Sequence, residues 1–160
     1  MQVLVYDAHS YDHEFLDAAN HDRHALTYIS AALDEQTIAL AQGIPAICCF
    51  VNDDGSAEIL RQLAAGGTRL LVLRSTGFNN IDLAAAQQLG MTVMRVSAYS
   101  PYAVAEFAVG LLQTLNRKIH RAYNRTRENN FRLGGLLGHD IHGKTVGVVG
   151  TGKIGAVFSR

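Results

Sequence analysis

The chain has 160 residues, of which 48% are apolar and 18% charged, and its formal net charge is zero. This composition excludes an intrinsically disordered chain, because enough apolar surface is available to form a packed core. It also argues against nucleic acid as a partner, because acidic and basic residues are equal in number.

No apolar run approaches the roughly 20 residues needed to cross a bilayer. The N-terminus MQVLVYDAHSYDHE turns acidic at once, unlike a signal peptide. We therefore expect a cytoplasmic protein with no membrane partner. Cys48 and Cys49 are neighbours in the run AICCFV, which predicts reduced core residues rather than a disulfide framework. The histidines show no metal-binding spacing, so no metal site is expected.

Short β-rich segments alternate with helical patterns along the first hundred residues. The predicted strands are 3–6, 25–29, 46–51, 69–73 and 92–96, and the predicted helices between them are 14–19, 35–42, 57–65 and 81–89. Gly43, Gly66 and Gly90 stand where glycines commonly end helices. This alternation predicts βαβ units and hence an α/β fold with a parallel sheet.

The pattern changes at Ser100 and Pro101, a capping residue followed by proline at the first helical position. The apolar positions that follow keep helical spacing; they are Val104, Ala108, Leu111, Leu115, Ile119 and Ala122. The spacing predicts one helix over 101–129, roughly 40 Å long at 1.5 Å per residue. A helix of that length is expected to bridge two domains.

The segment GTGKIG, residues 150–155, fits the GxGxxG fingerprint of dinucleotide-binding sites. It follows an apolar run at 144–149, which predicts a buried strand, and it precedes a helical AVFSR. In this setting Gly150 permits a tight turn, Gly152 lets the backbone approach a pyrophosphate, and Gly155 allows close packing of helix on strand. A glycine-rich turn without a ligand is the alternative interpretation.

A second candidate site is LRSTGFNNIDL, residues 73–83, at the carboxyl end of the fourth predicted strand. Open α/β sheets place ligands at that end. Successive backbone N–H groups of Ser75, Thr76 and Gly77 would suit a carboxylate. The alternative is a polar loop that caps the next helix through Asn79 or Asn80, and the residues alone favour this alternative.

Three segments taken together resemble the D-isomer-specific 2-hydroxyacid dehydrogenases, and within that family the bacterial fermentative D-lactate dehydrogenases. They are FVNDDGS at 50–56, the stretch 73–131 with RSTGFNNID and SAYSPYAVAEF, and GKTVGVVGTGKIG at 143–155. The resemblance implies a flavodoxin-like substrate domain over 1–100. It further implies that 101–160 contain a connecting helix and the first strand, turn and helix of a Rossmann domain that binds NAD.

The resemblance also implies roles for individual residues. Ser75, Thr76 and Gly77 would hold the substrate carboxylate, and Tyr99 would contact the substrate. The residues implied at the cofactor are Val104 near the nicotinamide and Gly150, Gly152, Lys153, Ile154 and Gly155 at the pyrophosphate. For Val104, packing on the apolar stripe is an equally direct explanation.

No residue in the chain matches the catalytic arginine, histidine and acidic residue of that family, so no catalytic residue is expected here. The resemblance implies that the complete enzyme reduces pyruvate to D-lactate with NADH, or a related 2-oxo acid to the corresponding D-2-hydroxy acid, and that it is a homo-oligomer through the nucleotide-domain side. The 160 residues alone would be inactive. The sequence leaves NAD and NADP undistinguished. The alternatives are another D-2-hydroxyacid dehydrogenase, or a non-catalytic module that binds a 2-oxo acid or dimerises.

Overall fold

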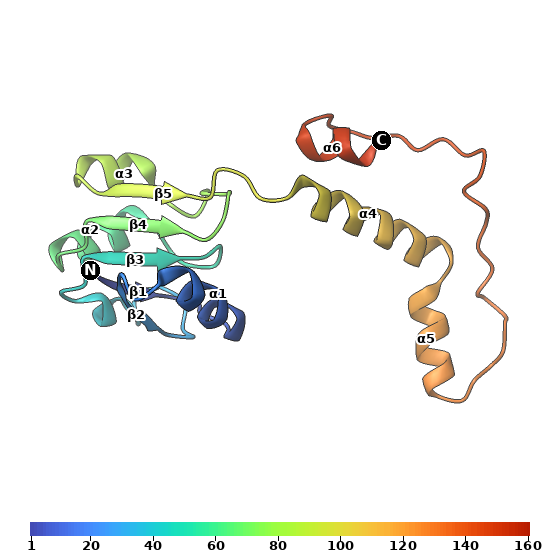
Figure 1. Ribbon diagram of the computed structural model, residues 1–160, viewed down its shortest axis with the longest axis horizontal. Helices are drawn as coiled ribbons and strands as arrows, with labels where there is room; N and C mark the ends of the chain where they lie inside the picture. Colours follow the sequence, from blue (N-terminus) through green and yellow to red (C-terminus); the bar gives the residue numbers. More distant parts are fainter. The chain divides into compact units, whose positions relative to one another are not determined.

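A computed structural model describes residues 1–160 as two units, Met1–Tyr99 and Ser100–Arg160 (Figure 1). The first unit contains a five-stranded sheet in the order β2-β1-β3-β4-β5, and every pair of neighbouring strands is parallel. The strands are β1 (Gln2–Val5), β2 (Ala25–Tyr28), β3 (Ala46–Cys49), β4 (Leu70–Leu73) and β5 (Thr92–Arg95). The predicted α/β fold with a parallel sheet is confirmed.

The connections of the first unit contain α1 (Ser10–Asn20), α2 (Ala57–Ala65), α3 (Leu83–Gln88) and the short 3-10 helix η1 (Ile38–Ala41). The helix predicted over 35–42 is therefore wrong apart from this one turn. The cause is local: the Asp34 carboxylate accepts hydrogen bonds from the N–H groups of Gln36 and Thr37. Such side-chain bonds satisfy the backbone in a turn instead of a helix, and they hold the pKa of Asp34 below its ordinary value.

Two of the glycines expected at helix ends adopt the left-handed conformation, Gly43 with φ of 77° and Gly90 with φ of 66°. The third, Gly66, ends α2 as its C-cap, as expected. Gly66 has a right-handed backbone, and Gly67 makes the left-handed turn with φ of 104°. Only glycine adopts this conformation at little cost.

The core of the first unit lies where α2 and α3 pack on the sheet, and β3 is buried along its whole length. The largest buried side chains include Tyr6, Ile47, Ile59, Leu60, Leu63, Leu71 and Leu73. Cys48 and Cys49 are buried free thiols, as predicted, and burial raises the pKa of both. Neither thiol is poised to react, because reactivity requires the thiolate.

Tyr6 supplies a testable consequence of this burial. Its hydroxyl donates to the Thr37 carbonyl at 3.0 Å, and burial raises its pKa to about 12. In the unfolded chain Tyr6 ionises near pH 10, so the stabilisation that it provides is complete below pH 10 and is lost as the pH rises toward about 12. We expect Tyr6→Phe to remove this part of the alkaline loss, measured as the free energy of unfolding against pH. An unchanged alkaline profile would contradict the assignment.

The second unit contains α4 (Pro101–Asn116), α5 (Ile119–Arg127) and α6 (Lys153–Phe158). Ser100 caps α4 as expected, because its hydroxyl accepts from the Ala103 N–H at 3.2 Å, and Pro101 occupies the first turn. The single helix predicted over 101–129 is wrong. It breaks at Lys118, which has a left-handed backbone with φ of 56°.

A second correction concerns residues 144–149, which form no strand. A strand needs a hydrogen-bonded partner, and none pairs with this segment in the chain. Large apolar side chains here and in the preceding loop are exposed, among them Leu133, Leu137 and Val149. Most residues from about 130 onward are thus exposed. None of the helices combines the length and apolar character that crossing a membrane would need.

Candidate functional site

The loop that follows β4, residues 74–82, lies at the carboxyl end of the parallel sheet, where ligands bind in such folds. Asn80 fixes it to the loop after β3: its side-chain amide donates to the carbonyls of Phe50 at 3.0 Å and Asp53 at 2.8 Å. The Gly55 N–H donates to the Asn80 carbonyl at 2.9 Å, and a Cβ at Gly55 would collide with the Ile81 side chain. Only glycine permits this close approach.

Asp53 is the buried support of the loop after β3. Its side chain is almost inaccessible, and its two carboxylate oxygens accept the N–H groups of Leu33 and Phe50, each at 2.6 Å. Burial raises the pKa of Asp53, while the two N–H donors act in the opposite direction. The carboxylate therefore holds in place the turn whose carbonyls bind Asn80.

Arg95, at the end of β5, holds the other side of the loop. Its guanidinium donates to the Thr76 carbonyl at 2.9 Å and lies over the Phe78 ring, 5.3 Å from the ring centroid. The Ser75 carbonyl accepts from the Val96 N–H at 3.2 Å, and the Ser75 hydroxyl donates to the Gly77 carbonyl at 2.8 Å. The carbonyls of Ser75, Thr76 and Gly77 are thus all engaged within the unit.

The N–H groups of the same three residues are not engaged. Neither the backbone nor the side-chain hydrogen bonds of the chain use the N–H of Ser75, Thr76 or Gly77 as a donor. Consecutive free N–H groups in an anchored loop are suited to bind a carboxylate. The alternative helix-cap interpretation names the wrong residues: Asp82 caps α3 by accepting from the Ala85 N–H at 2.9 Å, and Asn80 anchors the loop.

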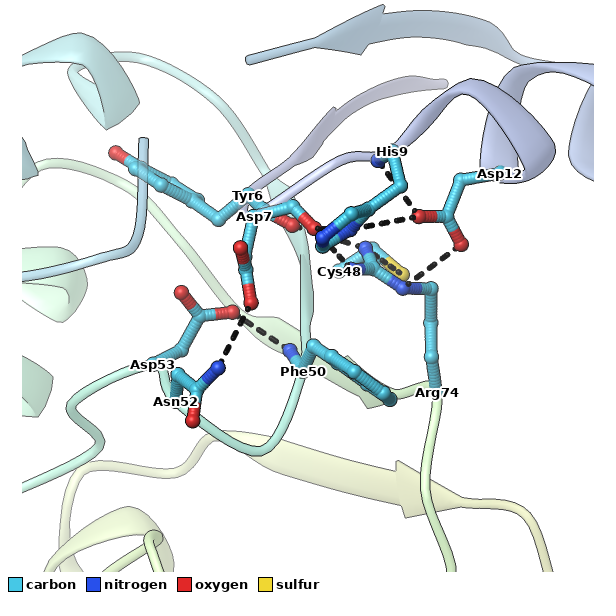
Figure 2. A network of polar contacts seen from close by, with 9 residues as sticks. All are labelled: Tyr6, Asp7, His9, Asp12, Cys48, Phe50, Asn52, Asp53 and Arg74. Atoms are coloured by element: carbon cyan, nitrogen blue, oxygen red, sulfur yellow. Dashed lines mark hydrogen bonds and ion pairs between the residues drawn. The ribbon is translucent and has the colours of Figure 1, made fainter. Parts of the chain in front are cut away.

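A polar network lies behind this loop, at the carboxyl ends of β1 and β3 (Figure 2). Arg74 joins the Asp12 carboxylate on α1 to the backbone carbonyls of Tyr6 and Asp7. None of these residues was predicted as part of the site. The only sequence signal is that Asp7 and Arg74 each stand just beyond a predicted strand, at the same edge of the sheet.

Tyr99, the last residue of the first unit, has a side chain that is 58% exposed. Among the residues expected at the cofactor, Val104 is half-buried on α4. Its implied place near the nicotinamide stays a prediction.

The glycine turn of the second unit has features that a dinucleotide requires. Gly150 has a left-handed backbone with φ of 96°, and a Cβ at Gly155 would collide with the Gly150 carbonyl oxygen. A Cβ at Gly152 meets open space, so the backbone there is accessible to a phosphate. Lys153 and Ile154 begin α6. These residues fit a pyrophosphate, and the turn lines an open cavity of about 580 Å³ with Ala108 and Phe158.

The sheet, the loop after β4 and the glycine turn define the class of protein. Residues 3–151 match the D-isomer specific 2-hydroxyacid dehydrogenase family, catalytic domain, so the chain belongs to this family, as predicted.

D-lactate dehydrogenase of Escherichia coli is 49% identical to this chain; the match covers all of this chain and 49% of the relative. 2-Hydroxyacid dehydrogenase homolog 1 of Schizosaccharomyces pombe is 50% identical; that match covers all of this chain and 48% of the relative. The apo-structure of the E. coli enzyme superposes on 99% of this chain with a TM-score of 0.93, covering 51% of that structure. D-lactate dehydrogenase from Lactobacillus jensenii, solved with NAD+, is 26% identical, with a TM-score of 0.69 over 99% of this chain and 49% of its own. The chain spans about half the length of the curated relatives that it matches.

Proposed function

We propose that this chain supplies the substrate-carboxylate loop and the beginning of the cofactor site of a D-lactate dehydrogenase that reduces pyruvate to D-lactate with NADH. The free N–H groups of Ser75, Thr76 and Gly77 carry the proposal, because they form an anchored anion site where the fold binds ligands. Similarity of about 50% to enzymes that include a D-lactate dehydrogenase supports this substrate.

The chain's residues would act by binding and orientation. Ser75, Thr76 and Gly77 would donate hydrogen bonds to the carboxylate of the 2-oxo acid, and Tyr99 would contact the rest of the substrate. Gly150, Gly152, Lys153, Ile154 and Gly155 would hold the pyrophosphate of the cofactor, with Val104 beside its nicotinamide. NADH, when bound, supplies the hydride. The NAD+ bound to the L. jensenii relative supports NAD rather than NADP.

The proton and the polarisation of the carbonyl would come from residues outside this chain. We therefore expect the purified 160-residue chain to show no pyruvate-dependent oxidation of NADH, because a general acid alone contributes about 10² to 10⁴-fold. The measurement is the loss of NADH absorbance, with the complete protein as the positive control. Turnover by the pure chain would contradict the proposal.

Steady-state kinetics of the complete protein with different 2-oxo acids distinguish the substrate classes. Preference for pyruvate over 2-oxo acids with longer side chains supports the lactate reaction, whereas the reverse preference indicates another D-2-hydroxyacid dehydrogenase. Binding of the pyruvate analogue oxamate without turnover would instead support a non-catalytic binding module.

We also propose that the complete protein is a homo-oligomer in the cytoplasm. Support for association comes from α4 and α5, whose exposed apolar side chains include Phe107, Leu111, Leu115, Ile119 and Tyr123. Exposed apolar patches of this kind mark contact surfaces. Sedimentation of the complete protein at several concentrations tests this, and a monomer at every concentration would contradict it.

A further inference from the structure

Arg74 directly precedes residues 75–77, here called the carboxylate loop, yet its side chain turns back into the first unit. Nη1 donates to the Tyr6 carbonyl at 3.0 Å, Nη2 donates to the Asp7 carbonyl at 2.9 Å, and Nε lies 3.3 Å from the Asp12 carboxylate. The guanidinium also lies over the Phe50 ring, 5.2 Å from its centroid. Figure 2 shows the Arg74 side chain reaching past Phe50 toward Asp12 and His9. All three nitrogens of the guanidinium therefore have partners in the scaffold.

The pair of Arg74 and Asp12 is largely buried, with 10% of each side chain exposed. The second Asp12 oxygen accepts the His9 N–H at 2.9 Å, so the same carboxylate also fixes the start of α1. A buried charge that loses its partner destabilises its surroundings strongly. The planar guanidinium donates in several fixed directions at once, which lysine cannot reproduce.

The Arg74 backbone completes the connection to the loop. Its N–H donates to the Cys49 carbonyl at 2.9 Å, so main chain and side chain are both fixed one residue before Ser75. Three residues thus anchor residues 74–82. Arg95 binds the Thr76 carbonyl, Asn80 binds the loop after β3, and Arg74 binds the Asp7 carbonyl. Of these anchors, only Arg74 contacts α1 and the residues that directly follow β1.

We propose that Arg74 is a positioning residue for substrate binding, held by Asp12, which sets the direction of the free N–H groups of Ser75, Thr76 and Gly77. The inference rests on the proposed function and deepens it. According to this inference, the start of α1 influences the affinity for the 2-oxo acid through the pair of Asp12 and Arg74.

Steady-state kinetics of the complete protein test this with Arg74→Gln, Arg74→Lys and Asp12→Asn. We expect Arg74→Gln to raise the KM for pyruvate about 10- to 100-fold, since small misplacement of binding groups has effects of that size. The kcat and the KM for NADH should change little. Arg74→Lys and Asp12→Asn should raise the KM for pyruvate less, because each keeps part of the network.

The matched control is Arg61→Gln, which removes an arginine–carboxylate pair with Glu58 on the exposed face of α2. Its KM for pyruvate should equal that of the wild type. A folded Arg74→Gln protein with an unchanged KM for pyruvate would overturn the proposal. A fall in kcat together with equal rises in the KM for pyruvate and the KM for NADH would overturn it too. If Arg74→Gln does not fold, the KM for pyruvate of Arg74→Lys and Asp12→Asn decides the matter in the same way.

A second readout separates this inference from the proposed function. In the 160-residue chain without substrate, the amide resonances of Ser75, Thr76 and Gly77 should move in Arg74→Lys and stay in place in Arg61→Gln. Unmoved resonances would overturn the positioning role. A wild-type protein that turns over no 2-oxo acid would overturn the proposed function and leave this structural result standing.

Discussion

Replacing Gly77 with proline is expected to raise the KM of the complete protein for pyruvate by roughly 10- to 150-fold. Proline has no N–H, so one donor of the carboxylate loop is lost. A hydrogen bond to a charged group contributes about 1.5 to 3 kcal/mol, and each 1.4 kcal/mol corresponds to about tenfold in affinity. The measurement is steady-state kinetics with pyruvate at saturating NADH.

Gly77→Ala is the comparison that isolates the lost donor. A Cβ at Gly77 meets no atom within 4 Å, and the backbone there is not left-handed, so alanine fits while the N–H is kept. We expect a much smaller rise in KM for this variant. Equal effects of alanine and proline would show that the N–H of Gly77 does not bind the carboxylate.

The strands of the parallel sheet were predictable from the sequence because each depends on a short continuous segment. Alternating β-rich and helical runs locate all five strands to within two residues, both the buried β3 and the more exposed edge strands β2 and β5. The loop at 75–77 was a candidate because it follows a strand and contains glycine. The residues alone favoured a helix cap, however, and the carboxylate role was implied only by the resemblance to the family.

The break between α4 and α5 and the contacts that hold the candidate site depend instead on residues far apart in the sequence. The helix break near Lys118 has no proline or glycine to signal it. At the end of α4, Asn116 exchanges hydrogen bonds with the His139 backbone, and a Cβ at Gly138 would collide with the Asn116 carbonyl. A segment more than twenty residues away therefore packs directly on the end of α4.

The same limit applies to the candidate site. Arg74 contacts the carbonyls of Tyr6 and Asp7, which lie 68 and 67 positions away in the chain. A residue that acts through such contacts leaves no local pattern. The free N–H groups could be predicted, but the residues that hold them could not.

Asp53→Ala is expected to lower the free energy of unfolding of the first unit by about 2 to 5 kcal/mol. The change leaves the N–H groups of the buried Leu33 and the half-buried Phe50 without acceptors, and an unsatisfied buried donor costs about 1 to 3 kcal/mol. Urea denaturation of the 160-residue chain, followed through the resonances of the first unit, gives the measurement. Asp53→Asn keeps one acceptor oxygen and should recover part of the loss.

Asp54→Ala is the matched control, because the neighbouring Asp54 is exposed and its carboxylate accepts only the Ser56 N–H. It should lose no more than about 1 kcal/mol, because Asp54 and Ser56 are both exposed and water replaces the lost bond without leaving a buried donor unsatisfied. The two variants should also differ at the site. Asp53 holds the turn whose carbonyls bind Asn80, so Asp53→Ala should move the amide resonances of Ser75 to Gly77, whereas Asp54→Ala should not. Equal loss of stability in both variants would contradict the buried supporting role of Asp53.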